Sequence, residues 1–288
     1  MANRIQDKKK NARKFTDRRS PLQKIAAAPH IVWMIMFIVA PMLFVVFFAF
    51  TDSNKSLTLA NIAQLTKYSN TFFLSIAFAL IATVVCLIIG YPLAYFMAKC
   101  GPRARKILLV LLMLPMWSNL LIRTYALMAL LDNGGLLNSL LESMGLNKIA
   151  IVGSEFGVVL GMIYDFLPYM VLPIFTTISK IDKRYTEAAA DLGCNAWKTM
   201  TKVIFPLSIS GVISGITMVF VPSISTFYIS QKLGAGKIDL IGDTIERLFQ
   251  NQATYYVGAA ISLVMMILIL ISVSIMNKFS DDEGGIII

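Results

Sequence analysis

The stretch KIDKRYTEAAADLGCNAWKTMTKVIFP, from Lys180 to Pro206, is the longest polar interruption in the second half of a very apolar sequence. Alanines at 188–190 favour a helix, Gly193 suits a left-handed position after it, and Asn195 can cap a second helix. Pro206 is expected to end that second helix. We therefore predict a compact polar hairpin of two short helices, which is either an ordinary connecting loop or a surface for a partner.

The composition around this hairpin is that of a multi-spanning membrane protein. Of the 288 residues, 57% are hydrophobic and 15% are charged, a balance outside the usual soluble range. The net charge of +10 would suggest nucleic acid as a partner of a soluble protein, but in a membrane protein it must first be compared with topology. His30 is the single histidine, which argues against a histidine-based metal site or a Ser/His catalytic pair.

Six apolar runs of about twenty residues predict an all-α, polytopic membrane protein with six transmembrane helices. A basic tail at 1–29 precedes a first helix at 30–51, and a five-helix core at 70–277 is followed by a short tail at 278–288. The core spans are expected at about 71–97, 107–131, 156–178, 207–229 and 256–276. The hairpin at 180–206 lies between the spans at 156–178 and 207–229. Prolines inside these spans predict kinked helices around a pathway.

The distribution of basic residues predicts the orientation of the chain in the bilayer. Most of the 26 Lys and Arg residues lie in the two tails, in the turn at 99–106 and in the hairpin. The positive-inside rule therefore places both termini and the hairpin in the cytoplasm. Much of the positive charge is then an orientation signal, so nucleic-acid binding loses its main support.

Two loops on the opposite side of the bilayer are expected to carry short helices. The amphipathic segment LLNSLLESMG follows a turn at 133–135, and Gly145 is expected to end it. Asp243 and Glu246 have the spacing of a capping box that opens a second short helix. These helices either pack on the bundle or form a platform for an extracytoplasmic partner.

Asp165 is the carboxylate that the sequence places inside a span, where an unpaired charge is costly. Tyr164 and Phe166 flank it, and Tyr169 lies one turn further on. An acidic group among aromatic rings suits an organic cation. The alternative, which the sequence leaves open, is a pairing with Arg123 or with a backbone group.

Further polar and aromatic side chains near span ends are candidates for lining a pathway. Trp117 and Asn119 follow a proline in the third span, and Tyr228 ends the fifth. Ordinary membrane-interface positions explain the aromatic residues equally well. The pairs Gly157–Gly161 and Gly211–Gly215 allow close helix packing, in the bundle core or at a subunit contact.

Motifs for chemistry within this chain are not found in the sequence. It has no glycine-rich phosphate loop followed by Lys-Ser/Thr, so it is not expected to bind ATP in the P-loop manner. It also has no zinc-ligand spacing and no nucleophile elbow, so we expect no metal site and no catalytic residues.

The hairpin resembles the EAA loop of type I ABC importer permeases, which have a MetI-like transmembrane core. The matching residues are Glu187-Ala188-Ala189, Gly193 and Pro206 at the family's spacing. Val203 and Phe205 stand where the family prefers Ile and Leu, which keeps an apolar helix end. The resemblance implies that the hairpin couples a partner ATPase to the membrane helices, with Glu187 offering charge to a basic residue of that ATPase and Gly193 making the bend.

The resemblance covers most of residues 70–276, through MLPMWSNLLIRTYALMALLDNGGLLNSLL, TEAAADLG and STFYISQKLGAGKIDLIGDTI. These stretches are similar to the spermidine/putrescine members of the family. The similarity implies a heterodimer with a second permease subunit, an ABC ATPase dimer on the cytoplasmic face and an extracytoplasmic polyamine-binding protein. ATP and Mg would be bound by the ATPase, so no cofactor is expected in this chain.

The hypothesis from the sequence is therefore a permease subunit that moves polyamines across the cytoplasmic membrane by alternating access. The ATPase-coupling residues are expected to be Glu187, Ala188, Ala189, Asp191, Gly193 and Pro206. The expected substrate pathway comprises Asp165, Tyr164, Phe166, Tyr169, Trp117, Asn119 and Tyr228. The alternatives are the same importer class with a different small solute, a membrane-embedded enzyme and a passive channel.

Overall fold

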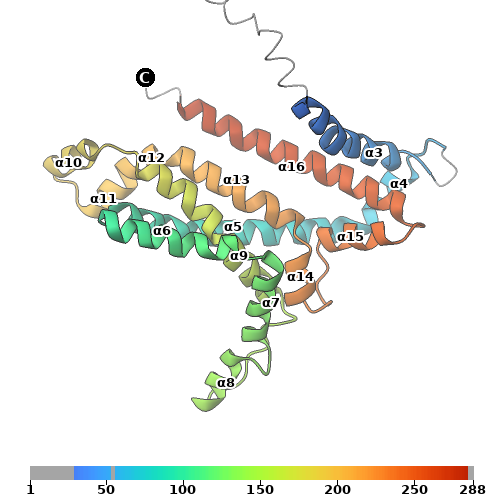
Figure 1. Cartoon of the computed structure of the whole chain (residues 1–288), viewed down its shortest axis with the longest axis horizontal. Coiled ribbons are helices and arrows are strands. Elements are labelled where there is room, and N and C mark those ends of the chain that lie inside the picture. Colours follow the sequence, from blue (N-terminus) through green and yellow to red (C-terminus); the bar gives the residue numbers. More distant parts are fainter. Residues whose placement is uncertain (1–28, 53–55, 285–288) are drawn as a thin grey trace, which may run out of the picture.

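The computed structural model describes residues 29–52 and 56–284, and within these ranges the chain is helical without any β-strand (Figure 1). An isolated antiparallel bridge joins Thr51 to Leu57. The basic tail expected at 1–29 lies almost entirely outside the described residues, as does the end of the C-terminal tail. The expected all-α fold class is confirmed.

Five helices are long and apolar enough to cross a membrane, counted over the described residues. They are Pro29–Ala49, Ala60–Lys99, Leu120–Ser143, Glu155–Ile178 and Tyr255–Met276. A sixth crossing results if the segments Ala196–Leu207 and Ile209–Ser225 form one span with a bend of 71°. The first, fourth and sixth expected spans agree closely with the structure, and the second, 71–97, falls inside the longer helix Ala60–Lys99. The third and the fifth differ from expectation.

Three helices form the packed centre of the bundle: α5 (Ser69–Lys99), α9 (Glu155–Ile178) and α13 (Ile209–Ser225). Glycine allows their close contact. A Cβ atom on Gly211 would stand 2.5 Å from Thr177 Oγ1, and one on Gly215 would stand 2.8 Å from Met170 Sδ. The Gly211–Gly215 pair therefore packs α13 onto α9, as one alternative predicted. Gly161 instead contacts α14 (Tyr228–Leu233), where a Cβ would clash with the side chain of Leu233.

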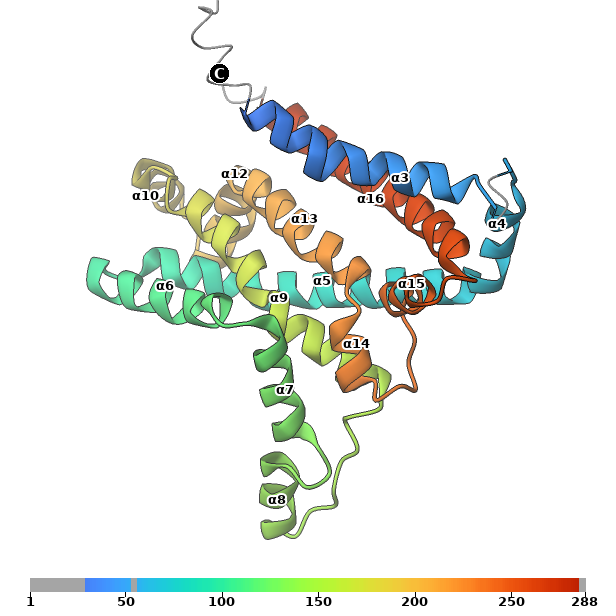
Figure 2. The same cartoon turned by 45° about the vertical axis from the view of Figure 1, so that its right-hand side comes forward.

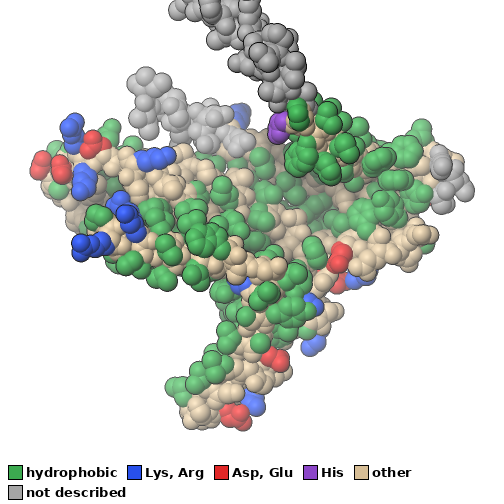
Figure 3. Space-filling view, in the orientation of Figure 1, with side chains coloured by type: hydrophobic (Ala, Val, Ile, Leu, Met, Phe, Trp, Pro, Cys, Tyr) green, Lys and Arg blue, Asp and Glu red, His purple; other side chains and the backbone are tan. Residues whose placement is uncertain are grey.

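The first helix, which includes α3 (Ala40–Ala49), lies beside α16 (Tyr255–Gly284) at the edge of the bundle. Its large apolar side chains are exposed, with Trp33 at 54% and Phe37 at 61%. Figure 3 shows hydrophobic side chains over the middle of the molecule, while charged side chains gather around the end that carries α10. This distribution fits a surface solvated by lipid.

The third expected span, 107–131, is wrong as a single helix. The structure ends α6 (Pro102–Trp117) and begins α7 (Leu120–Leu131) after a break at Ser118 and Asn119, and Figure 2 shows α7 leaving α6 steeply. Ser118 and Asn119 are extended, with ψ of 154° and 131°, and the Asn119 side chain caps α7. The segment that is long and apolar enough to cross a membrane is instead α7 together with α8 (Leu136–Ser143).

The two short helices expected between spans are both present. The amphipathic segment forms α8, and Gly145 follows it with a φ of +75°. The second helix, α15 (Ile241–Gln250), begins three residues earlier than a capping box of Asp243 and Glu246 predicts, because its N-cap residue is Leu240. Asp243 is therefore at the third helical position and accepts the N–H of the N-cap residue Leu240 at 3.0 Å, because a carboxylate there can reach back to that donor.

Candidate functional site

The polar hairpin starts with helix α10 (Lys183–Asp191), whose two ends are closed by local hydrogen bonds. Asp182 Oδ1 accepts the Arg184 N–H at 3.0 Å and caps the beginning. At the other end Gly193 has a φ of +76°, its N–H donates to Ala190 O, and the Cys194 N–H donates to Ala189 O. These two bonds form a Schellman motif, so the turn that the sequence predicted at Gly193 is confirmed.

The second part of the hairpin also begins as expected, but it does not end at Pro206. Asn195 Oδ1 caps α11 (Ala196–Thr199) by accepting the Lys198 N–H at 2.8 Å. The helix continues through the π-helical turn η3 (Met200–Ile204) into α12 (Phe205–Leu207), which contains Pro206. A π turn shifts the hydrogen-bond register, and this shift accommodates a residue without an N–H. The expected stop therefore falls at Ser208, where the chain bends by 71°.

The hairpin presents most of its side chains to the surroundings. Glu187, Ala188, Asp191 and Gly193 are exposed, and Ala189 is buried. Large apolar side chains are exposed among them, at 52% for Tyr185, 85% for Leu192 and 69% for Trp197. An ordered backbone that displays apolar and charged groups together is typical of a surface that binds a partner.

A buried contact joins the bend at Ser208 to the centre of the bundle. The hydroxyl groups of Tyr91, from α5, and Ser208 form a hydrogen bond of 3.0 Å. The ring of Tyr91 also packs against that of Phe205, with centroids 5.3 Å apart. The end of the hairpin is therefore in direct contact with α5 at the point where α13 begins.

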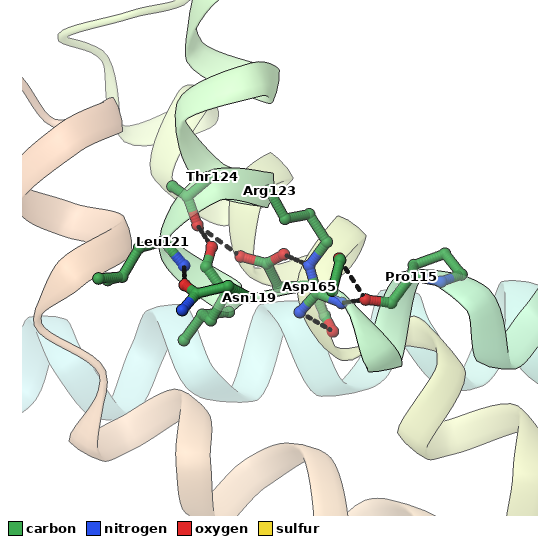
Figure 4. A network of polar contacts seen from close by, with 8 residues as sticks. Pro115, Asn119, Leu121, Arg123, Thr124 and Asp165 are labelled. Carbon is green, nitrogen blue, oxygen red and sulfur yellow. Dashed lines mark hydrogen bonds and ion pairs between the residues drawn. The ribbon is translucent and has the colours of Figure 1, made fainter.

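The carboxylate of Asp165 is fully buried and paired with Arg123 (Figure 4). Arg123 Nε lies 2.5 Å from Asp165 Oδ1, and Thr124 Oγ1 donates to Asp165 Oδ2 at 3.0 Å. Arg123 Nη1 also donates to Pro115 O at 2.8 Å, which ties the end of α6 to the start of α7. The pairing with Arg123, left open by the sequence, is therefore the arrangement found.

The aromatic residues around Asp165 do not form a cage for a cation in this conformation. Phe166 is 6% exposed and faces the core, and its ring packs on that of Tyr169 at 6.4 Å. Tyr164 is 43% exposed and lies 6.0 Å from the Arg123 guanidinium carbon. The carboxylate of Asp165 already has its cation, so a direct contact with substrate stays a prediction.

The other candidate pathway residues occupy separate places. Trp117 is 72% exposed at the end of α6, while Asn119 acts as a helix cap through a 2.8 Å bond from the Leu121 N–H. Tyr228 packs edge-on against Tyr125, with ring centroids 5.9 Å apart. The ammonium of Lys232 lies 4.9 Å from the Tyr125 centroid and 5.7 Å from that of Tyr228.

This aromatic pair with its lysine was missed by the sequence analysis. Lys232 and Tyr228 are four residues apart, so they share one face of α14, which is a signal that the sequence does contain. Tyr125 comes from α7, more than a hundred residues earlier, and nothing local links it to the other two. The cluster shows that an ammonium group is accommodated between these rings.

The chain matches, over residues 90–282, the family described as "Binding-protein-dependent transport system inner membrane component". The spermidine/putrescine transport system permease protein PotB of Haemophilus influenzae is 36% identical over 256 residues, covering 85% of this chain and 90% of that protein. PotB of Escherichia coli K12 is 36% identical over 245 residues, covering 82% and 89%. These relatives are named as transport permeases and not as enzymes.

The fold is also found in solved structures. A chain of a bacterial ABC transporter involved in the import of the acidic polysaccharide alginate superposes with a TM-score of 0.74 at 19% identity, covering 94% of this chain and 99% of that one. At this identity the likeness concerns the fold alone. The match to the family and the identity to the PotB proteins go further, and they show that the chain belongs to the multi-pass inner-membrane permease components of binding-protein-dependent ABC transporters.

Proposed function

We propose that this chain is one permease subunit of an ATP-driven importer for polyamines of the spermidine and putrescine class. The identity to PotB proteins over most of both chains supports this substrate class. Alternating access, and not an open pore, fits a bundle whose central helices α5, α9 and α13 are closely packed. The observation that carries the mechanism is the ordered hairpin around Gly193 with its exposed side chains.

The hairpin is the docking element for an ABC ATPase dimer in this proposal. A groove on the ATPase would cover Leu192 and Trp197, which the chain itself leaves exposed, and a basic residue of the groove would pair with Glu187. Closure of the ATPase dimer then moves the hairpin, and the Tyr91–Ser208 contact passes the movement to α5 and α13. ATP and Mg²⁺ belong to the ATPase. The described residues of this chain contain no cluster of metal-ligating side chains.

The remaining partners follow from the same arrangement. The hairpin and both termini face the cytoplasm, in agreement with the distribution of basic residues. A second, different permease subunit completes the pathway, and an extracytoplasmic binding protein delivers the polyamine at the end that carries α8 and α15. The Tyr125–Tyr228 pair, which already holds the Lys232 ammonium, is suited to an amine on its way through the bundle.

Reconstitution of the complete transporter in proteoliposomes tests this proposal. We expect ATP-dependent uptake of labelled spermidine when both permeases, the ATPase and the binding protein are present. Glu187→Lys and Trp197→Ala should each lower uptake by at least about tenfold and weaken copurification of the ATPase, because both side chains are placed at the docking surface.

Trp33→Ala is the matched control, since it removes an equally large exposed aromatic side chain from the lipid-facing first helix. It should leave ATPase binding unchanged. Uptake that survives Glu187→Lys and Trp197→Ala at the wild-type rate would contradict the coupling role of the hairpin. Uptake of sugars or sulfate in preference to spermidine would contradict the substrate class.

A further inference from the structure

A polar pocket of about 380 Å³ lies between α14, α15 and the loop that joins them. It is outside the helices that qualify as membrane spans. The lining is dominated by acidic and amide side chains, namely Gln231, Asp239, Asp243, Glu246, Arg247 and Gln250. We refer to these six residues as the acidic pocket. The proposed transport mechanism makes no use of it.

Asp243 is the buried carboxylate of the acidic pocket, with a relative exposure of 5%. Its Oδ2 accepts the Leu240 N–H, but its Oδ1 has no hydrogen-bond partner among the described residues. The hydroxyl of Ser230 lies beside this carboxylate and lowers its pKa, but its single hydrogen is donated to Phe227 O at 2.9 Å in this structure. A buried carboxylate oxygen without a donor is costly, and it therefore marks a position where a ligand can supply one.

The charges around Asp243 do not balance within the chain. Among the described residues, Arg247 is the only cation that lines the acidic pocket. Its Nη1 pairs with Asp239 Oδ2 at 2.8 Å. Glu246 is held by the neutral amides of Gln231 and Gln250, which do not compensate its charge. Asp243 and Glu246 are three residues apart on α15, so they lie on the same side of the helix. Two carboxylates thus face the pocket without a cation.

The geometry favours an aliphatic ammonium over a metal ion. A divalent cation needs several oxygen ligands within about 2.6 Å. The described residues contain no group of three carboxylates, cysteines or histidines close enough to hold one. The pocket is also much larger than a single ion. An ammonium group instead donates up to three hydrogen bonds to separate acceptors, and Asp243 Oδ1, Glu246 and the amide oxygens provide them.

We propose that the acidic pocket binds the primary ammonium end of an aliphatic di- or polyamine, with Asp243 Oδ1 and Glu246 as its carboxylate acceptors. The choice of a polyamine rests on the proposed function. In that setting the acidic pocket holds the free amine at the α15 end of the bundle before the amine enters the pathway between the helices. The site lies in this chain alone and requires neither the binding protein nor ATP.

Equilibrium binding of labelled putrescine to the assembled permease–ATPase complex in nanodiscs tests the proposal, without nucleotide and without the binding protein. We expect saturable binding at pH 7.5 that Asp243→Asn weakens by about tenfold or more, since a charge-assisted hydrogen bond is lost. The asparagine can still accept the Leu240 N–H and so preserve the start of α15. Glu246→Gln should weaken binding as well, and it leaves the buried carboxylate in place.

Glu142→Gln is the control, because Glu142 is an exposed acid that pairs with Lys148 at 3.2 Å away from the pocket. It should not change the affinity. Putrescine binding that is unchanged in both Asp243→Asn and Glu246→Gln would overturn the proposal. Displacement of putrescine by an equal concentration of Mg²⁺ would overturn the ammonium as the ligand.

A lysine side chain of the binding protein is the other source of an ammonium group. If Asp243→Asn weakens binding of the substrate-free binding protein and leaves putrescine binding intact, the free amine is the wrong occupant. Failure of this inference is distinguishable from failure of the proposed function. Spermidine uptake by the wild-type transporter without amine binding in the acidic pocket rejects only the pocket, whereas amine binding without ATP-dependent uptake rejects only the polyamine importer.

Discussion

Asp165 and Asp243 are both buried carboxylates, but the chain treats them in opposite ways. Asp165 lies within the bundle, where it pairs with the Arg123 guanidinium and accepts a hydrogen bond from the hydroxyl of Thr124. Arg123 is in turn bound to the backbone carbonyl of Pro115 near the end of α6. Asp243 lies at the end of the bundle, with one oxygen bound to a backbone N–H and the other without a partner. A buried acid that already has its cation serves the fold, while a buried acid that lacks one is available to a ligand.

Arg123→Ala should give the largest effect on this comparison, because it leaves Asp165 charged and unpaired in the bundle. Removing one partner of a buried ion pair costs about 3–5 kcal/mol, so we expect low yield and a strongly reduced unfolding temperature of the purified chain. The double variant Arg123→Met, Asp165→Leu should recover much of this loss. A single variant as stable as the wild type would mean that the pair does not stabilise the bundle.

Asp243→Asn should have the opposite effect on stability to Arg123→Ala, and it should stabilise the isolated complex at pH 7.5. Burial raises the pKa of Asp243 from 3.8 to about 6, and the negative charges of Asp239 and Glu246 raise it further. The Ser230 hydroxyl and the Leu240 N–H lower it in part. Ionising this group therefore destabilises the folded state by on the order of 3 kcal/mol above pH 6. The wild type should gain stability as the pH falls from 6 towards 4, and the asparagine variant should not.

Thermal unfolding between pH 7.5 and pH 5, measured without added amine, checks this prediction. The two proteins should differ most at pH 7.5 and converge at the acidic end. Added putrescine should raise the unfolding temperature of the wild type at pH 7.5, since a ligand that binds only the folded state stabilises it. An asparagine variant less stable than the wild type at pH 7.5 would show that Asp243 has a cation that the structure does not reveal.

Thr124→Val should cost less than the loss of Arg123, on the order of 1–3 kcal/mol. Valine keeps the shape of threonine but removes the hydroxyl that donates to Asp165 Oδ2, and Thr124 is fully buried. Arg123 continues to pair with the other oxygen, so the charge stays compensated. Unfolding of the purified complex measures the loss, and Thr124→Ser, which retains the hydroxyl, should recover most of it.

Features that depend on neighbouring residues could be predicted from the sequence, whereas contacts between distant residues could not. The turn at Gly193 and the cap at Asn195 were predictable, because they depend only on neighbouring residues. The break at Ser118 and Asn119 was not, since the apolar run continues on both sides of it. Pairing of Arg123 with Asp165 stayed open because 42 residues separate them, and tertiary packing decides such contacts.

Glu246→Gln should have the smallest effect on stability, but it should change the pKa of Asp243 in the acidic pocket. Glu246 is partly exposed and held by two neutral amides, so we expect a change in unfolding free energy within about 0.5 kcal/mol. Its negative charge is one of the causes that raise the pKa of Asp243. Removing that charge should move the pKa of Asp243 downwards from about 6, and the pH at which stability begins to rise should move with it. A pH profile identical to that of the wild type would mean that the charge of Glu246 does not affect the ionisation of Asp243. The two carboxylates would then be too far apart to bind a single ammonium group.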